Sequence, residues 1–302
     1  MRWRKLGRVF ACDGRRTWSR THAAVPTVGA VTGGPVRVYY TTRDSRQRSH
    51  GAWFDLDLVG LRVVAACDEP ILTPGPIGAY DDCGAMITWA ESDGPDTRLY
   101  VIGWNLTQTV PMRNAVGLAR VGPEGGLARR MFTGPILDRS PVDPCFVGTV
   151  CTRRSGPAWE MWYQSCVEWQ DRPEGLRHRY HLKYATSTDG VNWDRDGTAC
   201  IDFRDHSEYA ICRASVVKDG AVYRMWYCHR GDRYRIGYAE SPDGRRWDRQ
   251  DHRVGIDVTP GDWDGDMIEY PCVFDAPGGR YMLYNGDGYG ATGIGLAVLE
   301  QD

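Results

Sequence analysis

The chain has 302 residues, of which 42% are hydrophobic and 11% aromatic, and this composition suits a globular protein with a substantial core. Because 37 basic residues nearly balance 39 acidic ones, the net charge of −2 provides no basic excess for binding nucleic acid. No run of apolar residues approaches the length of a transmembrane span, so we expect no membrane partner.

The first ten residues carry charges but no apolar run of signal-peptide length. Most of the ten cysteines lie in or beside predicted strands, and none forms a Cys-x-x-Cys pair. We therefore expect a reduced, cytoplasmic protein with no metal site and no cofactor. Residues 3–10 either complete the last repeat of the fold as a strand or do not; the sequence leaves this open, and it leaves the oligomeric state open as well.

Apolar and polar residues alternate along most of the remaining chain, which is the pattern of half-buried strands. In chain order, five copies of one unit are predicted at residues 25–28, 36–40 and 51–56; 98–104 and 115–120; 161–163 and 183–187; 222–227 and 235–240; and 271–274, 280–284 and 293–298. No long segment has a convincing 3.6-residue period. The pattern therefore predicts an all-β chain.

The third and fourth copies repeat one phrase in strict register. Met-Trp-Tyr precedes Tyr-Ala-x-Ser-x-Asp-Gly-x-x-Trp in both, and Asp189 and Asp243 lie 54 residues apart, as do Trp193 and Trp247. Asp-Gly is typical of turns, so we assign these repeated residues to turns and not to chemistry. Five copies of about 60 residues predict one domain, residues 1–302, folded as a five-bladed β-propeller with blades of about four antiparallel strands around a central channel.

The segment that leads into each copy is unusually polar. These segments are residues 19–22, 80–84, 138–144, 208–213 and 264–271. The innermost strands of a propeller line its channel and ligands bind at one mouth, so the five segments are expected to meet there. Carboxylates that crowd a mouth spread their pKa values apart, so one can act as an acid and another as a base.

The candidate residues follow from this placement. The candidate catalytic residues are Asp81, Asp82, Glu208 and His22, and the candidate substrate-binding residues are Arg20, Arg139, Asp143, Arg213, Glu269, Tyr80, Tyr209 and Tyr270. Arginines hold carboxylates or a bound anion in bidentate fashion, and the tyrosines provide faces on which a sugar stacks. Neighbouring side chains of a strand point to opposite faces, so only one of Asp81 and Asp82 faces the channel. Glu269 is either part of the site or an inter-blade ion pair.

Taken together, the blade phrases resemble the five-bladed β-propeller glycoside hydrolase superfamily, which contains invertase-like, arabinanase/xylosidase-like and mannoside-phosphorylase-like families. The resemblance rests on Tyr-x-Met-Trp-Tyr at 223–227, on the two Tyr-Ala-x-Ser-x-Asp-Gly-x-x-Trp phrases, and on Tyr-Asn-Gly-Asp-Gly-Tyr-Gly at 284–290. It covers nearly the whole chain and is specific for the fold more than for the reaction.

The resemblance implies an acidic triad: a base from the first blade, an Asp that tunes pKa values from the second, and a Glu general acid from a later blade. Asp81 or Asp82 matches the second position and Glu208 matches the later one. The first blade departs from the pattern, because His22 and its neighbours stand where an Asp-Pro is expected. His22 is then a substitute base or a substrate ligand.

Three functions remain open at this stage. The first is cleavage of a glycosidic bond in a small or activated sugar, including one that bears phosphate or a nucleotide. The second is phosphorolysis, for which a cluster of Arg and His residues would hold phosphate. The third is a non-hydrolytic propeller that binds or modifies a sugar or nucleotide sugar.

Overall fold

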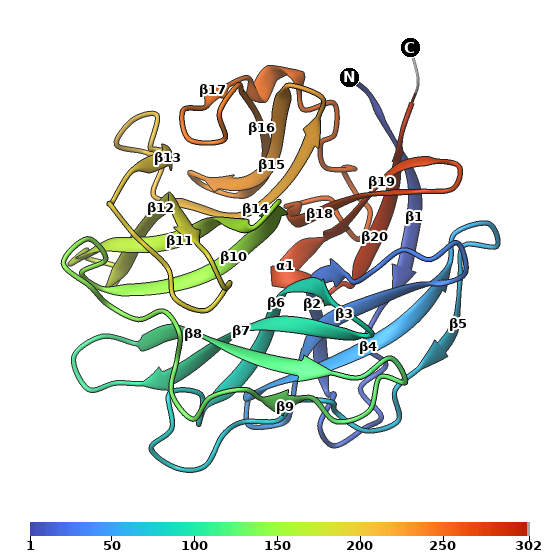
Figure 1. Ribbon diagram of the computed structural model, residues 1–302, viewed down its shortest axis with the longest axis horizontal. Coiled ribbons are helices and arrows are strands. Elements are labelled where there is room, and N and C mark those ends of the chain that lie inside the picture. The colour runs from blue at the N-terminus through green and yellow to red at the C-terminus, as the bar shows by residue number, and fades with distance from the viewer. Residues whose placement is uncertain (301–302) are drawn as a thin grey trace.

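The computed structural model describes residues 1–300, and strands make up nearly all of the regular structure in this part of the chain (Figure 1). Helical structure there is limited to the 3-10 turn η1 (Asp251–Arg253) and the short α1 (Asp287–Gly290). No helix within residues 1–300 has the length and apolar character needed to cross a membrane.

The strands form antiparallel groups of four, and each group is a meander in which neighbours along the chain pair. The first group is β2 (Thr21–Val28), β3 (Val36–Arg43), β4 (Ser49–Asp57) and β5 (Arg62–Ala66). The second is β6 (Gly84–Asp93), β7 (Asp96–Leu106), β8 (Met112–Val121) and β9 (Arg129–Arg130). The third is β10 (Phe146–Ser155), β11 (Ala158–Gln170), β12 (Arg177–Ser187) and β13 (Ala199–Ile201). The fourth is β14 (Ala210–Asp219), β15 (Val222–Arg230), β16 (Tyr234–Ser241) and β17 (Asp248–Arg249).

The last group is completed by the start of the chain. It contains β18 (Glu269–Ala276), β19 (Gly279–Asn285), β20 (Ile294–Leu299) and, paired with β20, β1 (Trp3–Phe10). By hydrogen bonding alone residues 1–300 form three sheets, because a single parallel bridge joins the first group to the second and another joins the third to the fourth. The open question about residues 3–10 is thereby answered: they close the last group.

The first strands of the groups surround the centre of the molecule. β2 contacts β6, β6 contacts β10, β10 contacts β14, β14 contacts β18, and β18 contacts β2, so the ring of inner strands closes (Figure 1). Buried aromatic and aliphatic side chains fill the spaces between the groups. This arrangement confirms the predicted all-β propeller fold.

Each inner strand has an irregular register against its neighbour, at corresponding places in the five groups. His22, Arg213 and Tyr270 adopt positive φ angles of 65°, 53° and 53° in or next to these irregularities. Non-glycine residues rarely adopt such angles, and β-bulges bend a strand and redirect its side chains. Three of the inner strands, β2, β14 and β18, therefore carry backbone strain in or next to a register irregularity.

The repeated Asp-Gly phrases form the turns that dock one group onto the next. Asp189 and Asp243 each accept hydrogen bonds from the backbone amides of the residues two and three positions after them. The carbonyl of Gly244 in turn accepts a hydrogen bond of 2.7 Å from the buried Trp162 indole of the preceding group. The repeated motif is therefore structural.

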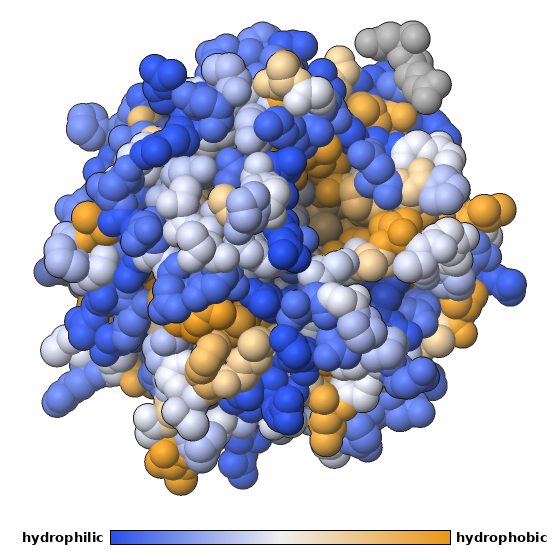
Figure 2. Space-filling view, in the orientation of Figure 1, coloured by the Kyte–Doolittle hydropathy of each residue, from blue (hydrophilic) through white to orange (hydrophobic). Residues whose placement is uncertain are grey.

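The first and last groups are joined across the closure by buried contacts. The amide nitrogen of Asn285 donates to the carbonyl of Ala23 at 2.6 Å, and its oxygen accepts the amide of Val25 at 2.8 Å. Phe10 stacks on Phe54 with ring centroids 4.3 Å apart. The face shown in Figure 2 is largely hydrophilic, but hydrophobic residues gather in a hollow over the region of β18 to β20.

Candidate active site at the channel mouth

Four acidic side chains of the leading segments form ion pairs with their own group of strands. The pairs are Asp81 with Arg130 at 2.6 Å, Asp143 with Arg195 at 2.7 Å, Glu208 with Arg249 at 2.8 Å, and Asp264 with Lys5 at 2.6 Å. In each pair the acidic side chain is at most 7% exposed. Three of the basic partners lie on the outermost strand of their group, β9, β17 or β1. We call this recurring contact the blade clasp.

The first group has the clasp with its charges reversed. There Arg16 precedes the inner strand and bonds Asp68, just after β5, at 3.0 Å. Arg16 also donates to the carbonyl of Cys67. Unlike the acidic side chains of the other four pairs, the Asp68 side chain is 95% exposed, so this pair is expected to contribute little to stability.

The clasp keeps Glu208 ionised. Burial by itself would raise the pKa of this carboxyl, but hydrogen bonds from Arg249 and His229 outweigh it and hold the pKa well below its usual range. Glu208 lies just before β14, not within it. An ionised carboxylate has no proton to donate, so the paired state of Glu208 suits a structural or basic role better than that of general acid.

Asp143 occupies the most elaborate clasp. Its carboxylate is fully buried and accepts hydrogen bonds from Tyr163 at 3.1 Å, Ser165 at 2.7 Å and Arg195 at 2.7 Å, with Lys183 at 3.5 Å. These partners lie on or beside β11 and β12, so the carboxylate contacts the body of its own group.

The neighbouring carboxylates Asp81 and Asp82 both lie in turns before β6, not in a strand. Asp82 accepts hydrogen bonds from the amide of Gly78 at 3.0 Å and from Asn105 at 2.6 Å, and these two contacts lower its pKa. Asp82 is therefore an ionised, partly exposed carboxylate at the end of β7. Its assignment as a catalytic residue stays a prediction.

Tyr80 lies across the middle strands of the second group. A Cβ atom added to Gly117 of β8 would come within 1.7 Å of the Tyr80 hydroxyl, and one added to Gly103 of β7 would come within 2.4 Å of its ring. Burial raises the pKa of Tyr80 to about 12. The tyrosine therefore needs both glycines in order to pack against the strands.

Arg213 fills the centre of the ring of inner strands. It is fully buried, and its guanidinium donates to the carbonyl of Pro26 in β2 at 2.6 Å and to that of Thr88 in β6. Its backbone amide donates to Thr149 of β10 at 2.8 Å. Arg213 thus ties three inner strands together. Arg20 and Arg139, by contrast, are exposed.

Glu269, the first residue of β18, is the exception among the predicted carboxylates. Its side chain is fully buried, and neither carboxyl oxygen has a hydrogen-bond partner within residues 1–300. Burial raises its pKa well above the usual value, against the opposing influence of Arg230 and Arg43. A raised pKa favours the protonated form of the carboxyl group, which can donate a proton or a hydrogen bond.

Tyrosines enclose Glu269. Tyr180 and Tyr234 are buried and share a hydrogen bond between their hydroxyls, and Tyr270 follows Glu269 directly. The charge of Glu269 would raise the pKa of each of the three, in addition to the larger effect of burial. Tyr209 lies beside this group, 6.2 Å from the ring of His178.

His22 also faces the mouth, and it is neutral. Burial and the nearby Arg43 lower its pKa to about 4, and its Nδ1 atom lies 2.9 Å from the hydroxyl of Thr21. Because Arg43 acts on both His22 and Glu269, these three residues share one electrostatic environment at the start of β2 and β18.

Arg230 is a functional candidate that repeat phase did not identify. Its guanidinium lies over the rings of Tyr209, Tyr234 and Tyr289 at 5.3, 5.3 and 5.9 Å, and it donates to the Tyr289 hydroxyl at 2.6 Å. Tyr289 stands on α1 with a φ of 62°. Arg43, Arg230 and Tyr289 each lie in the hairpin between the second and third strands of their group. The position of a residue within the repeat drew attention only to the segments before the first strands.

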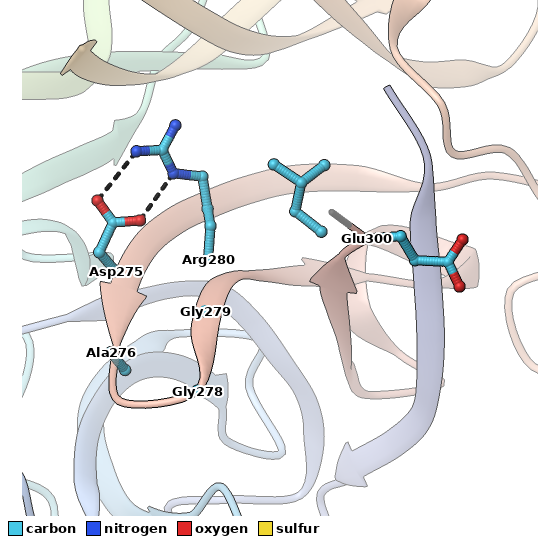
Figure 3. Close-up of a pocket in the computed structure, with 7 residues that line it drawn as sticks. Asp275, Ala276, Gly278, Gly279, Arg280 and Glu300 are labelled. Atoms are coloured by element: carbon cyan, nitrogen blue, oxygen red, sulfur yellow. Dashed lines mark hydrogen bonds and ion pairs between the residues drawn. The ribbon is translucent and has the colours of Figure 1, made fainter. Parts of the chain in front are cut away.

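A separate hollow of about 550 Å³ lies at the opposite end of β18 (Figure 3). It is lined by Asp275, Ala276, Gly278, Gly279, Arg280, Leu299 and Glu300. Arg280 is bound there by two hydrogen bonds to Asp275, and it also pairs with Asp219 at 2.7 Å. Its charge is already neutralised, and none of the sequence-predicted residues lines this hollow. The mouth around Glu269 is therefore the better candidate site.

Comparison with solved structures defines the class of fold. A structure of BT0996, described as an RGII complex, superposes with a TM-score of 0.77 and 18% identity, covering 98% of this chain and 91% of the other. A structure described as "Glycoside hydrolase" gives the same score and identity over 99% and 92%. A thermostable family-43 glycoside hydrolase gives a TM-score of 0.66 at 12% identity over 95% and 93%. The fold is that of the propeller-type glycoside hydrolases.

Two Mycobacterium tuberculosis proteins are similar to this chain over nearly its whole length. "Uncharacterized protein MT1551" and "Uncharacterized protein Rv1502", from two strains, are each 44% identical over 301 residues, which cover 99% of this chain and all of theirs. The chain belongs to the same family as these proteins. No family model matches the sequence.

Proposed function

We propose that the protein cleaves a glycosidic bond of a small or activated sugar at the channel mouth, with Glu269 as the proton donor. One observation carries the proposal: Glu269 is fully buried, has no hydrogen-bond partner within residues 1–300, and has a pKa raised well above its usual value. A carboxylic acid held neutral beside a ligand site is what protonation of a leaving oxygen requires. The fold shared with glycoside hydrolases supports the same class of reaction.

Proton transfer would leave a negative charge on Glu269. Arg230 and Arg43 would stabilise that carboxylate, since both already act to lower its pKa. Water would supply the hydroxyl group of the hydrolysed product, and its proton would go to a base. Asp82, which is ionised, and His22, which is neutral, are the two candidates for that base.

A second function, phosphorolysis, is favoured by one specific feature of the mouth. Within residues 1–300 no carboxylate lies within hydrogen-bond distance of Glu269, whereas two guanidinium groups act on it. Phosphate is a nucleophile that arrives ionised, so its attack on the sugar would need no second carboxylate. A non-catalytic sugar-binding propeller is the remaining alternative, and it would bind these ligands without turnover.

The test begins with thermal shifts of the purified protein against sugars, sugar phosphates and nucleotide sugars, because a ligand that binds only the folded state raises its melting temperature. Ligands that bind are then assayed for release of free sugar, with and without phosphate. We expect Glu269→Gln to reduce turnover by about 100-fold or more while binding persists. Asp82→Asn tests the proposed base in the same assay.

The matched control is Glu124→Gln, because Glu124 is exposed and should leave turnover unchanged. If Glu269→Gln retained full turnover of a cleaved substrate, Glu269 would not be the proton donor. Binding without turnover of any bound ligand would favour the non-catalytic alternative.

A further inference from the structure

Arg43 and Arg230, at the mouth, lack the acidic partners that two other arginines near them possess. Arg48, in the same hairpin as Arg43, bonds Asp44 at 2.9 Å, and Arg249, behind Tyr227, bonds Glu208 at 2.8 Å. Arg43 and Arg230, in contrast, form no ion pair within 4.0 Å in the described part of the chain. Both positive charges act electrostatically on Glu269 and lower its pKa, against the larger opposing effect of burial.

Arg230 is held in place without being neutralised. Three tyrosine rings surround its guanidinium, and the Tyr289 hydroxyl accepts one of its hydrogen bonds. Its Nε atom is buried and has no partner within residues 1–300. Aromatic faces attract a cation, but they do not accept the N–H groups that lie in the plane of the guanidinium. The guanidinium is therefore fixed with donors to spare.

Glu269 adds an unsatisfied polar group to the same place. Its side chain is fully buried, and both carboxyl oxygens lack partners among the described residues. An orphaned buried polar group costs stability, so in functional sites it commonly marks the position of a ligand atom. In its protonated form, which burial favours, the carboxyl group would donate a hydrogen bond to that ligand and would not repel an anion.

We infer that Arg43 and Arg230 form a subsite for an anionic group of the ligand, a phosphate or a carboxylate, held next to Glu269. This inference deepens the proposed function and rests on it for the identification of the ligand as a sugar. Guanidinium groups bind oxyanions through charge-assisted, often bidentate hydrogen bonds. A sugar phosphate, a uronic acid and free phosphate all present this chemistry.

The test is isothermal titration of the full chain at low ionic strength with four probes: inorganic phosphate, glucose 1-phosphate, glucuronate and uncharged glucose. We expect at least one anionic probe to bind more tightly than glucose. Arg230→Gln and Arg43→Gln should each weaken that binding by about 10-fold to 100-fold, since one charge-assisted hydrogen bond contributes that much. Binding of phosphate itself would indicate a free anion, and binding of charged sugars alone would indicate a group carried by the substrate.

Arg154→Gln is the matched control. Arg154 also lies over an aromatic ring, that of Trp159 at 5.6 Å, and also lacks an ion pair within residues 1–300, but it stands at the far end of β10. Anion binding should survive this change. Arg230→Lys keeps the charge and guards against misfolding of the Gln variant; it should retain intermediate affinity.

The subsite is refuted if no anion binds more tightly than glucose, or if Arg154→Gln weakens binding as much as Arg230→Gln. Different results would refute the proposed function. Turnover of an uncharged glycoside that is lost in Glu269→Gln, without anion binding, would refute the subsite and leave the reaction standing. Anion binding without turnover of any sugar would support the subsite and refute the reaction.

Discussion

Glu208 and Glu269 look alike in the sequence, because each is a glutamate just before or at the start of an inner strand. In the structure their electrostatic surroundings are opposite. Hydrogen bonds from Arg249 and His229 keep the pKa of Glu208 low, whereas burial without a partner keeps the pKa of Glu269 high. The difference depends on whether a basic group lies within hydrogen-bond distance: among residues 1–300, two such groups reach Glu208 but none reaches Glu269.

The raised pKa of Glu269 predicts a pH dependence of stability. Above the pKa of the unfolded chain, the unfolded state loses this proton while the folded state retains it, so the free energy of unfolding falls as pH rises. The slope from one such group is about 1.4 kcal/mol per pH unit. Glu269→Gln cannot ionise, so the variant should gain stability relative to the parent from pH 5 to pH 8 in urea unfolding.

Glu124→Gln provides the comparison at the same pH values, because an exposed carboxylate has similar surroundings in both states. A stability difference between Glu269→Gln and the parent that stays constant from pH 5 to pH 8 would show that Glu269 ionises normally in the folded protein.

At the scale of the structural element, the blade clasp explains why acidic residues recur at one phase of the repeat. In four of the five groups, an ion pair joins the leading segment to a residue of the same group. The reversed pair of Arg16 and Asp68 in the first group keeps the contact and exchanges the charges. An acidic residue that recurs at one position of the repeat can therefore have a structural role within its blade instead of a catalytic one.

A double-mutant cycle at Glu208 and Arg249 tests this role. Both side chains are largely buried, so each single change, Glu208→Gln or Arg249→Met, should leave an unpaired partner and cost about 3–5 kcal/mol in urea unfolding. The double variant should lose less than the sum of the two. Arg245→Gln breaks the exposed pair with Asp196 and should cost less than about 1 kcal/mol.

Additive losses in this cycle would mean that the two side chains do not stabilise the fold as a pair. If Glu208→Gln abolished turnover while the free energy of unfolding stayed unchanged, the assignment of Glu208 as a catalytic residue would be supported in preference to the clasp.

At the scale of the whole molecule, closure of the ring depends on the start of the chain. β1 pairs with β20, Trp3 packs edge-on against Trp226 at 5.7 Å, and Phe10 stacks on Phe54. Arg213 and Asn285 add hydrogen bonds between groups near the axis. The contacts that hold the ring together therefore join residues far apart in sequence.

Trp3→Ala tests the closure. Trp3 is only 5% exposed, and removal of a buried tryptophan side chain typically costs about 3–5 kcal/mol. The midpoint of urea unfolding should fall accordingly, whereas Val59→Ala, at a fully solvated position, should leave it unchanged. A Trp3→Ala variant as stable as the parent would show that β1 contributes little to closing the ring.

Several features of the fold could be predicted because they are local. Alternation of apolar and polar residues indicated the strands, and the Asp-Gly phrases at Asp189 and Asp243 indicated turns that the structure contains. The site was harder to predict. Phase along the repeat identified Glu269 and His22, but it also selected Asp143 and Glu208, whose carboxylates are bound in clasps.

The sequence did not identify Arg43 and Arg230 as site residues, because it does not show whether an arginine in a hairpin has an acidic partner in the folded protein. Repetition specifies the strand, its turn and its register, since these depend on neighbours a few residues away. Which charges meet, and which remain unpaired at the mouth, depends on how the groups of strands close into a ring. Only the tertiary structure brings Arg43, Arg230 and Glu269 together from three separate groups of strands, and burial in that structure raises the pKa of Glu269 against the opposing influence of the two arginines.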